Sequence, residues 1–239
     1  MKLIPVVDLM HGQVVRAVRG DRLAYQPIVS HLCSGSDPVN VASAMCDHCA
    51  TQQLYVADLD ALLGKPAQVA VLRSLLQALP DLELWLDAGF ANAHAAQALR
   101  DEFESDGRRV VPVFGSESLA SRSALVDCFS AAASDASGQA GVLSLDRRAG
   151  QRLDAAGCWD EPELWPKRVI VMTLERVGSD AGPDLETLAD VQRKSPVTLM
   201  VGAGGIRDER DLERAGQAGA AAWLVASALH DGRLPRRHD

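Results

Sequence analysis

The residues best suited to chemistry are carboxylates that follow short apolar runs, at positions where buried strands would end. They are Asp8, Asp58, Asp87, Asp146, and Glu175 close after Thr173. In a ring of eight strands, Asp8 and Asp146 would belong to strands on opposite sides and would flank a small substrate. Such a pair can act as general base and general acid if one carboxyl has a raised pKa and the other stays ionised. The alternative is that these carboxylates cap loops or pair with Arg16, Arg147 and Arg148.

A glycine-rich turn near the C-terminus predicts an anion site. Residues 197–211 read VTLMVGAGGIRDERD, an apolar run, then glycines, then a helix start that Asp208 can cap. A second apolar run, residues 222–229 (AWLVASAL), ends in a small residue and a serine that open another helix. A TIM barrel holds phosphate at such a pair of turns, after its seventh and eighth strands. We therefore predict phosphate binding by Gly204, Gly205, Ala226 and Ser227.

The elements that must position these residues alternate along the chain as strand and helix. Eight apolar runs, at residues 2–8, 54–58, 82–86, 109–114, 141–145, 168–173, 197–201 and 222–229, are separated by helical patterns. Helices are expected from Pro38, from about Pro66, after Asn92, from Ser118 and near Asp184, with a hairpin at residues 12–18, a turn at Gly20-Asp21 and an irregular stretch at 146–166. The pattern predicts an α/β fold, a single (β/α)₈ TIM-barrel domain over residues 1–239, and the length is close to the roughly 250 residues typical of one.

A weak internal repeat divides the chain. LWLDAGFAN (84–92) aligns with MVGAGGIRD (200–208), VPVFGSESL (111–119) with AWLVASALH (222–230), and VVDL near Asp8 with LSLD near Asp146. Two fused half-barrels related by a pseudo-twofold axis would give this pattern. The repeat predicts a second anion site across the barrel mouth, at Gly89, Gly115 and Ser116.

Composition narrows the class of partner. The net charge of −8 argues against a nucleic-acid partner, and no apolar run approaches the roughly 18 residues of a membrane span. The N-terminus becomes polar too soon for a signal peptide, so we expect a cytoplasmic protein. A phosphorylated small molecule is the expected partner, with no nucleic acid and no membrane, and the protein is expected to be a monomer or a small homo-oligomer.

Metal and cofactor chemistry find little support in the sequence. The five cysteines fit reduced thiols, and Cys46, His48 and Cys49 form either a zinc site or, as helical spacing favours, part of an apolar helix face. Magnesium at Asp58, Asp60 and Asp87 is a further alternative. No lysine stands at the end of an expected strand, which disfavours Schiff-base chemistry. We expect no metal and no cofactor.

These motifs resemble one family over nearly the whole chain. IPVVDLMHGQVVRAVRGD, LYVADLDAL, VLSLDRRAG, VGAGGIRDERDL and WLVASALHDGR resemble phosphoribosylformimino-AICAR-ribotide isomerase, the HisA-like family of histidine synthesis. The resemblance implies a barrel of two half-barrels and a cofactor-free Amadori rearrangement of an aminoaldose phosphate to an aminoketose. It implies that Asp8 is the general base, that Asp146 is the general acid and that Thr173 helps to order the site.

Three stretches depart from the family pattern. Where the family has a Gly-Gly-Gly-Ile-Arg-type turn, this chain has Asp-Ala-Gly-Phe-Ala at residues 87–91, although Gly115 and Ser116 keep the other half of that phosphate site. The loop at residues 176–179 lacks the family's Asp-Gly, and Tyr55 stands where the family usually has histidine. We therefore expect a substrate with two phosphates to bind poorly on the first side. The chain looks similar to a divergent branch found in methanogens and methylotrophs.

The sequence thus predicts an aldose–ketose isomerase, of the intramolecular oxidoreductase type, that acts on a phosphorylated sugar derivative in a histidine-pathway-like reaction. One alternative is a divergent paralogue that acts on a singly phosphorylated substrate in one-carbon cofactor (methanopterin or methanofuran) biosynthesis. A second alternative is a non-catalytic barrel that binds a phosphorylated ligand or a partner subunit.

Overall fold

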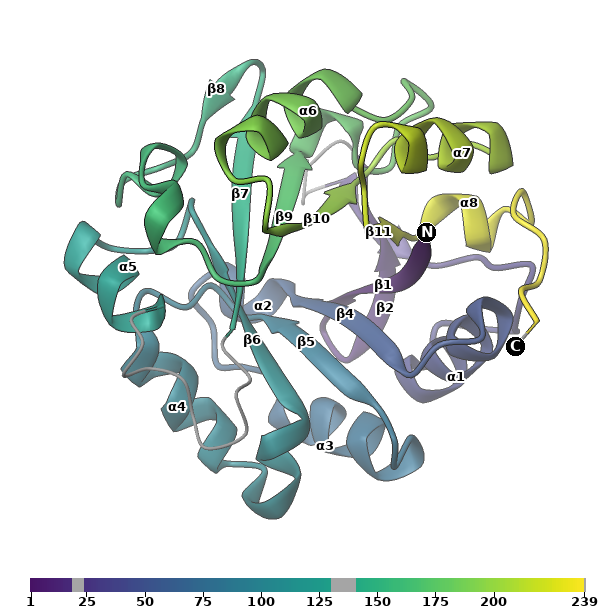
Figure 1. The fold of residues 1–239 in the computed structure, drawn as a ribbon. Helices are drawn as coiled ribbons and strands as arrows, with labels where there is room; N and C mark the ends of the chain where they lie inside the picture. Colours follow the sequence, from purple (N-terminus) through teal and green to yellow (C-terminus); the bar gives the residue numbers. More distant parts are fainter. Residues whose placement is uncertain (19–23, 130–140, 239) are drawn as a thin grey trace.

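The computed structural model describes residues 1–18, 24–129 and 141–238. Within these ranges, eight parallel strands form a closed barrel, with α-helices around it (Figure 1). In order around the barrel they are β1 (Lys2–Met10), β4 (Gln53–Asp58), β5 (Glu83–Asp87), β6 (Val110–Gly115), β7 (Val142–Arg148), β9 (Arg168–Thr173), β10 (Leu199–Ala203) and β11 (Ala222–Val225). β11 pairs with β1 and closes the ring. The prediction of a TIM barrel is confirmed.

The helices begin where the sequence supplies capping residues. The side chains of Asp37, Asn92, Asp184 and Asp208 each accept a hydrogen bond from a backbone amide three residues on. The helices that follow these caps are α1 (Pro38–Cys49), α4 (Ala93–Asp101), α6 (Leu185–Lys194) and α7 (Glu209–Gln217). The others are α2 (Leu59–Leu62), α3 (Val69–Ala78), α5 (Arg122–Phe129) and α8 (Ser227–His230).

Several expected boundaries are wrong for local reasons. The helix expected from Pro66 begins at Val69, because Asp58 first caps the one-turn α2 and also accepts from the amide of Gln68. The helix expected from Ser118 begins at Arg122, because the Ser118 amide closes a turn on the Gly115 carbonyl. β10 starts at Leu199 rather than residue 197, and the last apolar run is split into β11 and α8.

Two apolar layers hold the barrel. Successive residues of a strand point to opposite faces, so Leu54 and Val56 pack under the helices while Tyr55 and Ala57 face the barrel interior. Ile4, Trp85, Val113, Ile170 and Leu224 are among the residues that fill the interior. Both faces of the sheet are buried, which is why the strands read as continuous apolar runs rather than alternating ones.

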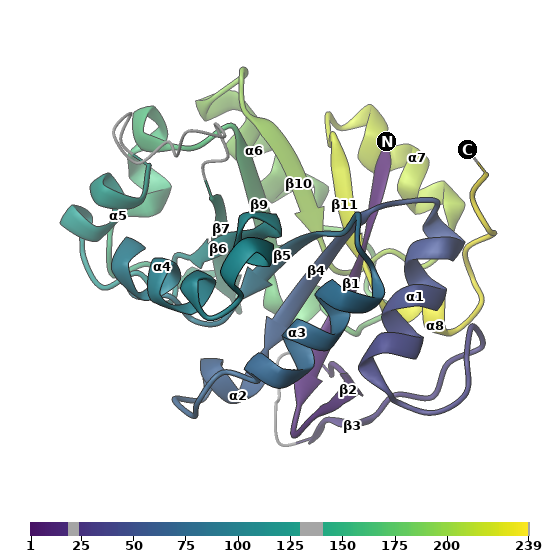
Figure 2. The same ribbon diagram turned by 90° about the horizontal axis from the view of Figure 1, so that it is seen from below.

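The barrel end that carries the carboxyl ends of the strands also carries the irregular segments. β2 (Gln13–Arg16) pairs antiparallel with β1 and with β3 (Gln26–Pro27), so the predicted hairpin is present, while the Gly20-Asp21 turn lies outside the described residues. Figure 2 shows β2, β3 and α2 gathered at the end toward which β1 and β4 run. In the irregular stretch 146–166, β8 (Gln151–Arg152) folds back on β7, and the short 3₁₀ turns η4 (Cys158–Asp160) and η5 (Pro162–Leu164) follow.

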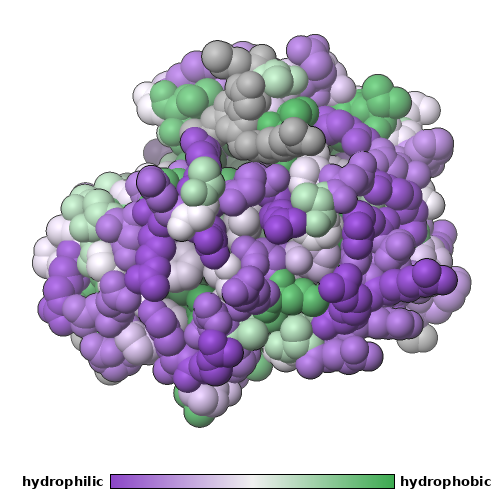
Figure 3. Space-filling view, turned by 90° about the horizontal axis from the view of Figure 1, so that it is seen from above, coloured by the Kyte–Doolittle hydropathy of each residue, from purple (hydrophilic) through white to green (hydrophobic). Residues whose placement is uncertain are grey.

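The outer surface is mainly hydrophilic on the face drawn in Figure 3, where hydrophobic side chains form small separate patches. Among the described residues, no helix combines the length and the apolar character that crossing a membrane requires. Cys46 and Cys49 are buried in the core beside Ala42 and Met45.

Candidate active site

A pocket opens at the carboxyl ends of the barrel strands. Four carboxyl side chains line it, from Asp8 on β1, Asp87 on β5, Asp146 on β7 and Glu117 just after β6. Residues of two turns line it as well: Gly204 and Gly205 after β10, and Ala226 and Ser227 after β11. Since β1 and β7 lie four strands apart in a ring of eight, Asp8 and Asp146 approach the pocket from opposite sides. The structure therefore brings together the two carboxylates and the two turns that the sequence singled out.

Asp146 is buried at this pocket, with 5% of its surface exposed. Its Oδ1 accepts a hydrogen bond of 2.6 Å from the Ser144 hydroxyl, and its Oδ2 accepts one of 3.4 Å from the amide of Glu117. Burial raises the pKa of Asp146 well above its usual value, and the negative charges of Glu117 and Asp87 raise it further, against the opposing effect of the Ser144 hydrogen bond. A carboxyl with a raised pKa can carry a proton near neutral pH, as a general acid must.

The buried Tyr55 and the half-buried Asp87 form a pair in the same pocket as Asp146. The Tyr55 hydroxyl donates to Asp87 Oδ2 at 2.9 Å, and the amide of Gly89 donates to Asp87 Oδ1 at 3.1 Å. Burial, followed by the charge of Asp87, raises the pKa of the Tyr55 phenol well above its usual value. The charges of Asp146 and Asp8 raise it further, and all three carboxylates line the same pocket as the phenol.

The turn after β10 depends on its glycines. Gly204 and Gly205 have φ of +78° and +79°, and a Cβ at Gly205 would lie 2.2 Å from the carbonyl oxygen of Gly182. In the part of the chain that the structure describes, the amide of Gly205 donates to no protein acceptor. The amide and hydroxyl of Ser227, in the neighbouring turn, likewise have no acceptor among the described residues. These are the donors that an anion in the pocket would need.

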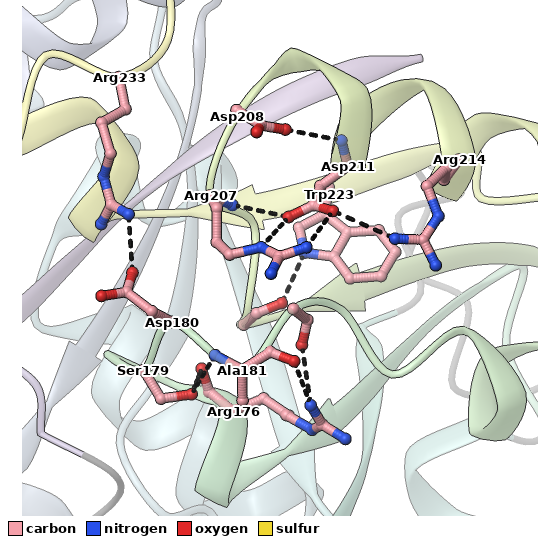
Figure 4. Close-up of polar contacts among 12 residues, drawn as sticks. Arg176, Ser179, Asp180, Ala181, Arg207, Asp208, Asp211, Arg214, Trp223 and Arg233 are labelled. Carbon is pink, nitrogen blue, oxygen red and sulfur yellow. Dashed lines mark hydrogen bonds and ion pairs between the residues drawn. The ribbon is translucent and has the colours of Figure 1, made fainter.

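Charged side chains fix the loops around this turn (Figure 4). The carboxylate of Asp211, 1% exposed, accepts from the amide, Nε and Nη2 of Arg207 at 2.8–3.1 Å, and Arg214 approaches it from the other side. Asp180, in the loop after β9, forms an ion pair of 2.7 Å with Arg233, beyond α8. The loop after β9 is thereby held against the segment that follows β11.

The turns that the sequence repeat aligns with these, at Gly89 and at Gly115-Ser116, are placed differently. Gly89, Gly115 and Ser116 do not line the pocket. The Ser116 hydroxyl is fully buried and donates to the Leu153 carbonyl at 2.7 Å, while accepting from the Asp146 amide. A Cβ at Gly115 would lie 3.0 Å from Asp146 Oδ2, so the glycine makes room for that carboxylate. Phosphate binding on this side stays a prediction.

Thr173 lies outside the pocket. Its hydroxyl donates to Asp184 Oδ2 at 2.7 Å, and Thr187 donates to the same oxygen at 2.8 Å. Although burial opposes it, these hydrogen bonds hold the pKa of Asp184 below its usual value. Met172 and Leu174, its neighbours in the chain, line the pocket instead. Thr173 can therefore influence the site only through the position of β9 against α6.

Comparison with known proteins places this architecture in a family. A family model described as histidine biosynthesis protein matches residues 2–235. The chain belongs to this family. The 1-(5-phosphoribosyl)-5-((5-phosphoribosylamino)methylideneamino) imidazole-4-carboxamide isomerase of Thermus thermophilus is 30% identical over 98% of this chain and 96% of its own length. The isomerase of the same name from Cenarchaeum symbiosum is 27% identical over 98% and 97%.

Another relative bears no activity in its name. An uncharacterized protein of Methanocaldococcus jannaschii is 27% identical over 98% of this chain and 95% of its own length. This chain of the histidine biosynthesis family is thus similar both to named isomerases and to a protein without an assigned reaction.

Two residues of the pocket were not predicted from the sequence. Glu117 and Tyr55 line it, although neither was predicted as a site residue. For Tyr55 the signal was strand alternation, which puts it on the same face as Ala57 and toward the interior. For Glu117 the available signal was its position directly after the predicted Ser116, in the turn that follows an expected strand.

The residues considered for metals have other partners. Asp58 accepts from the amides of Ala61 and Gln68, and Asp60 accepts from the His11 amide and pairs with Lys65. Burial raises the pKa of both Cys46 and Cys49 to about 12. Across the described residues, no three His, Cys, Asp or Glu side chains are grouped to hold a metal ion.

Proposed function

We propose that this protein is an isomerase that converts a phosphorylated aminoaldose derivative into the corresponding aminoketose. The observation that carries the proposal is that Asp8 and Asp146 line one pocket from opposite sides, together with Gly204, Gly205, Ala226 and Ser227. An acid, a base and a set of unused amide donors are what an Amadori rearrangement of a sugar phosphate requires. The reactions named for the Thermus and Cenarchaeum relatives support the same class.

In the proposed mechanism, Asp146 gives its proton to the ring oxygen of the sugar. The C1–O bond then breaks, and a C1=N bond forms with the substrate's nitrogen lone pair. Asp8 removes the proton from C2, which gives an enaminol. The C2 hydroxyl then gives its proton to the ionised Asp146 while Asp8 returns a proton to C1, which yields the C2 ketone and restores both carboxyl groups. The reaction redistributes electrons within the substrate and needs no external oxidant or reductant. Proton transfer of this kind contributes about 10²–10⁴-fold to the rate.

The two turns of the second half would hold the phosphate. The amide of Gly205 and the amide and hydroxyl of Ser227 supply donors, and the positive φ of Gly204 and Gly205 brings their backbone close to the ligand. A fixed phosphate would place the sugar ring between the two carboxylates, so that binding energy is used for orientation. Thr173, through Asp184, would serve as a positioning residue for β9 and α6.

The proposal is tested by assaying conversion of two substrates by NMR. One is the two-phosphate ribotide of the named isomerases, and the other is an N-aryl ribosylamine 5-phosphate with one phosphate. We expect wild type to convert at least one of them and Asp8→Asn to convert neither. Folded wild type that accelerates neither substrate over buffer would contradict the proposal and favour a non-catalytic phosphate-binding barrel.

A second candidate is the same reaction in another pathway, such as one-carbon cofactor (methanopterin or methanofuran) biosynthesis. The Asp87–Tyr55 pair favours it, because a carboxylate now lies at the turn where the family's first phosphate loop is expected. Growth of a strain that lacks the histidine-pathway isomerase separates the candidates. Rescue by wild type and not by Asp8→Asn would assign the histidine step, whereas no rescue by soluble protein would favour the second candidate.

A further inference from the structure

The backbone amides at aligned positions of the internal repeat differ in whether they have a hydrogen-bond acceptor within the protein. In the internal alignment, Gly89 corresponds to Gly205, and both have positive φ, of 69° and 79°. The Gly89 amide donates to Asp87 Oδ1 at 3.1 Å, while the Gly205 amide meets no protein acceptor in the part of the chain that the structure describes. Asp87 itself corresponds to Ala203, whose side chain has no acceptor group.

The second pair of turns shows the same contrast. Glu117 corresponds to Ala228, and the amide of Glu117 donates to Asp146 Oδ2 at 3.4 Å. Ser116 corresponds to Ser227, but the Ser116 amide donates to the Ser144 carbonyl at 2.8 Å and its hydroxyl donates to the Leu153 carbonyl. The amides of Gly89, Ser116 and Glu117 and the hydroxyl of Ser116 therefore already have acceptors within the chain. Two of these acceptors are the carboxylates of Asp87 and Asp146.

From this asymmetry we propose that the carboxylates of Asp87 and Asp146 occupy the second anion site, the one that the repeat predicts at Gly89, Gly115 and Ser116. The substrate then carries one phosphate and presents hydrogen-bond donors at its other end. This inference rests on the proposed function only for the assignment of the second-half turns to the phosphate. The far group is an amine, amide or hydroxyl-bearing group rather than a second phosphate.

The electrostatics of the pocket agree with this assignment. Among the described lining residues, four carry carboxyl groups and Arg148, exposed at the rim, is the cationic one. Asp87, Glu117 and Asp146 lie on the first-half side or facing it, so a second phosphate there would meet like charges. A carboxylate has about four lone-pair sites, so Asp87 can accept from a ligand in addition to Tyr55 and Gly89.

The test is the number of inorganic phosphate ions bound per chain, measured by equilibrium dialysis, with Asp87→Ala as the principal variant. Asp87→Ala gives the first turn the residue type of Ala203 and releases the Gly89 amide. We expect wild type to bind one phosphate and Asp87→Ala to bind two. We also expect affinity for the two-phosphate ribotide to rise about tenfold or more in Asp87→Ala. Affinity for ribose 5-phosphate should change by less than about threefold, since its phosphate uses the other half.

Asp87→Asn is the matched control, because its amide oxygen still accepts from Gly89 while the charge is removed. We expect it to keep one phosphate. Two phosphates on wild type, no gain in folded Asp87→Ala, or an equal gain in Asp87→Asn would each overturn the proposal. Because the measurement needs no turnover, it can succeed where the isomerase assay fails, and the reverse. Ala203→Asp supplies the converse test and should lose the remaining phosphate.

Discussion

The hydroxyl of Tyr55 on β4 donates a 2.9 Å hydrogen bond to the carboxylate of Asp87 on the neighbouring strand β5. Tyr55 is 3% exposed, so its polar atom depends on this partner. The pair fixes the Asp87 carboxylate at the pocket and leaves its other oxygen to the Gly89 amide. Two positions at which the sequence analysis expects a departure from the family pattern, 55 and 87, are thereby coupled by a hydrogen bond.

Removing this hydroxyl should be costly because the Asp87 carboxyl loses a hydrogen-bond donor. Tyr55→Phe is expected to lower the free energy of unfolding by about 1.5–3 kcal/mol, the range for a hydrogen bond to a charged group. Urea denaturation at pH 7 of Tyr55→Phe, Asp87→Asn and the double variant measures the coupling between the two residues. Losses that simply add would show that the hydrogen bond contributes nothing.

Asp146 should be a site where function opposes stability. Its pKa is raised by burial and by Glu117 and Asp87, so the folded state holds a proton that the unfolded chain releases near pH 4. Stability is therefore fully present below about pH 4 and is lost as the pH rises toward the folded pKa. Asp146→Asn should melt at a higher temperature than wild type, with a difference that grows from pH 4 to pH 8. A difference independent of pH would refute this.

Asp211 should show the opposite sign. Hydrogen bonds from Arg207 lower its pKa, so it contributes stability above about pH 4 that is lost as the pH falls. Asp211→Asn is expected to destabilise the protein by about 1.5–3 kcal/mol at pH 7 and by much less near pH 3. Thermal unfolding at both pH values checks this. Asp190→Asn, on the exposed face of α6, is the control and should change little at either pH.

The turn after β10 should tolerate no Cβ at Gly205. Gly205→Ala would place that atom 2.2 Å from the Gly182 oxygen at a φ of +79°, so we expect a loss of about 3 kcal/mol or more and weaker phosphate binding. Gly35→Ala is the control, because Gly35 has a similar φ of +75° with no atom within 4 Å of the added Cβ. It should lose only about 1 kcal/mol. Equal losses in denaturant would mean that backbone strain alone, and not the close approach, requires Gly205.

The barrel could be predicted because its signals are local. Buried parallel strands appear in the sequence as apolar runs. The starts of four helices could be predicted from their capping residues, Asp37, Asn92, Asp184 and Asp208. The start of α3 was missed because the Asp58 side chain reaches ten residues along the chain, to Gln68. A contact between residues ten positions apart does not alter the periodic pattern of apolar residues from which a helix start is predicted.

The site could be predicted in outline but not in its hydrogen bonds. Strand ends meet at one face of a barrel, so Asp8 and Asp146 could be placed in one pocket from their positions alone. The inward orientation of Tyr55 follows from strand alternation, but its bond to Asp87 depends on the register between β4 and β5. The outward placement of Thr173, toward Asp184, likewise depends on how α6 packs against β9.

The measurement that tests the central claim most directly is turnover of an N-aryl ribosylamine 5-phosphate by wild type, Asp8→Asn, Asp146→Asn and the Asp190→Asn control, followed by NMR. The proposed acid–base pair predicts that wild type and Asp190→Asn form the aminoketose at similar rates. It predicts that Asp8→Asn and Asp146→Asn are each slower by about 10²-fold or more. Conversion by both pocket variants at the wild-type rate would contradict the assignment of Asp8 and Asp146 as base and acid.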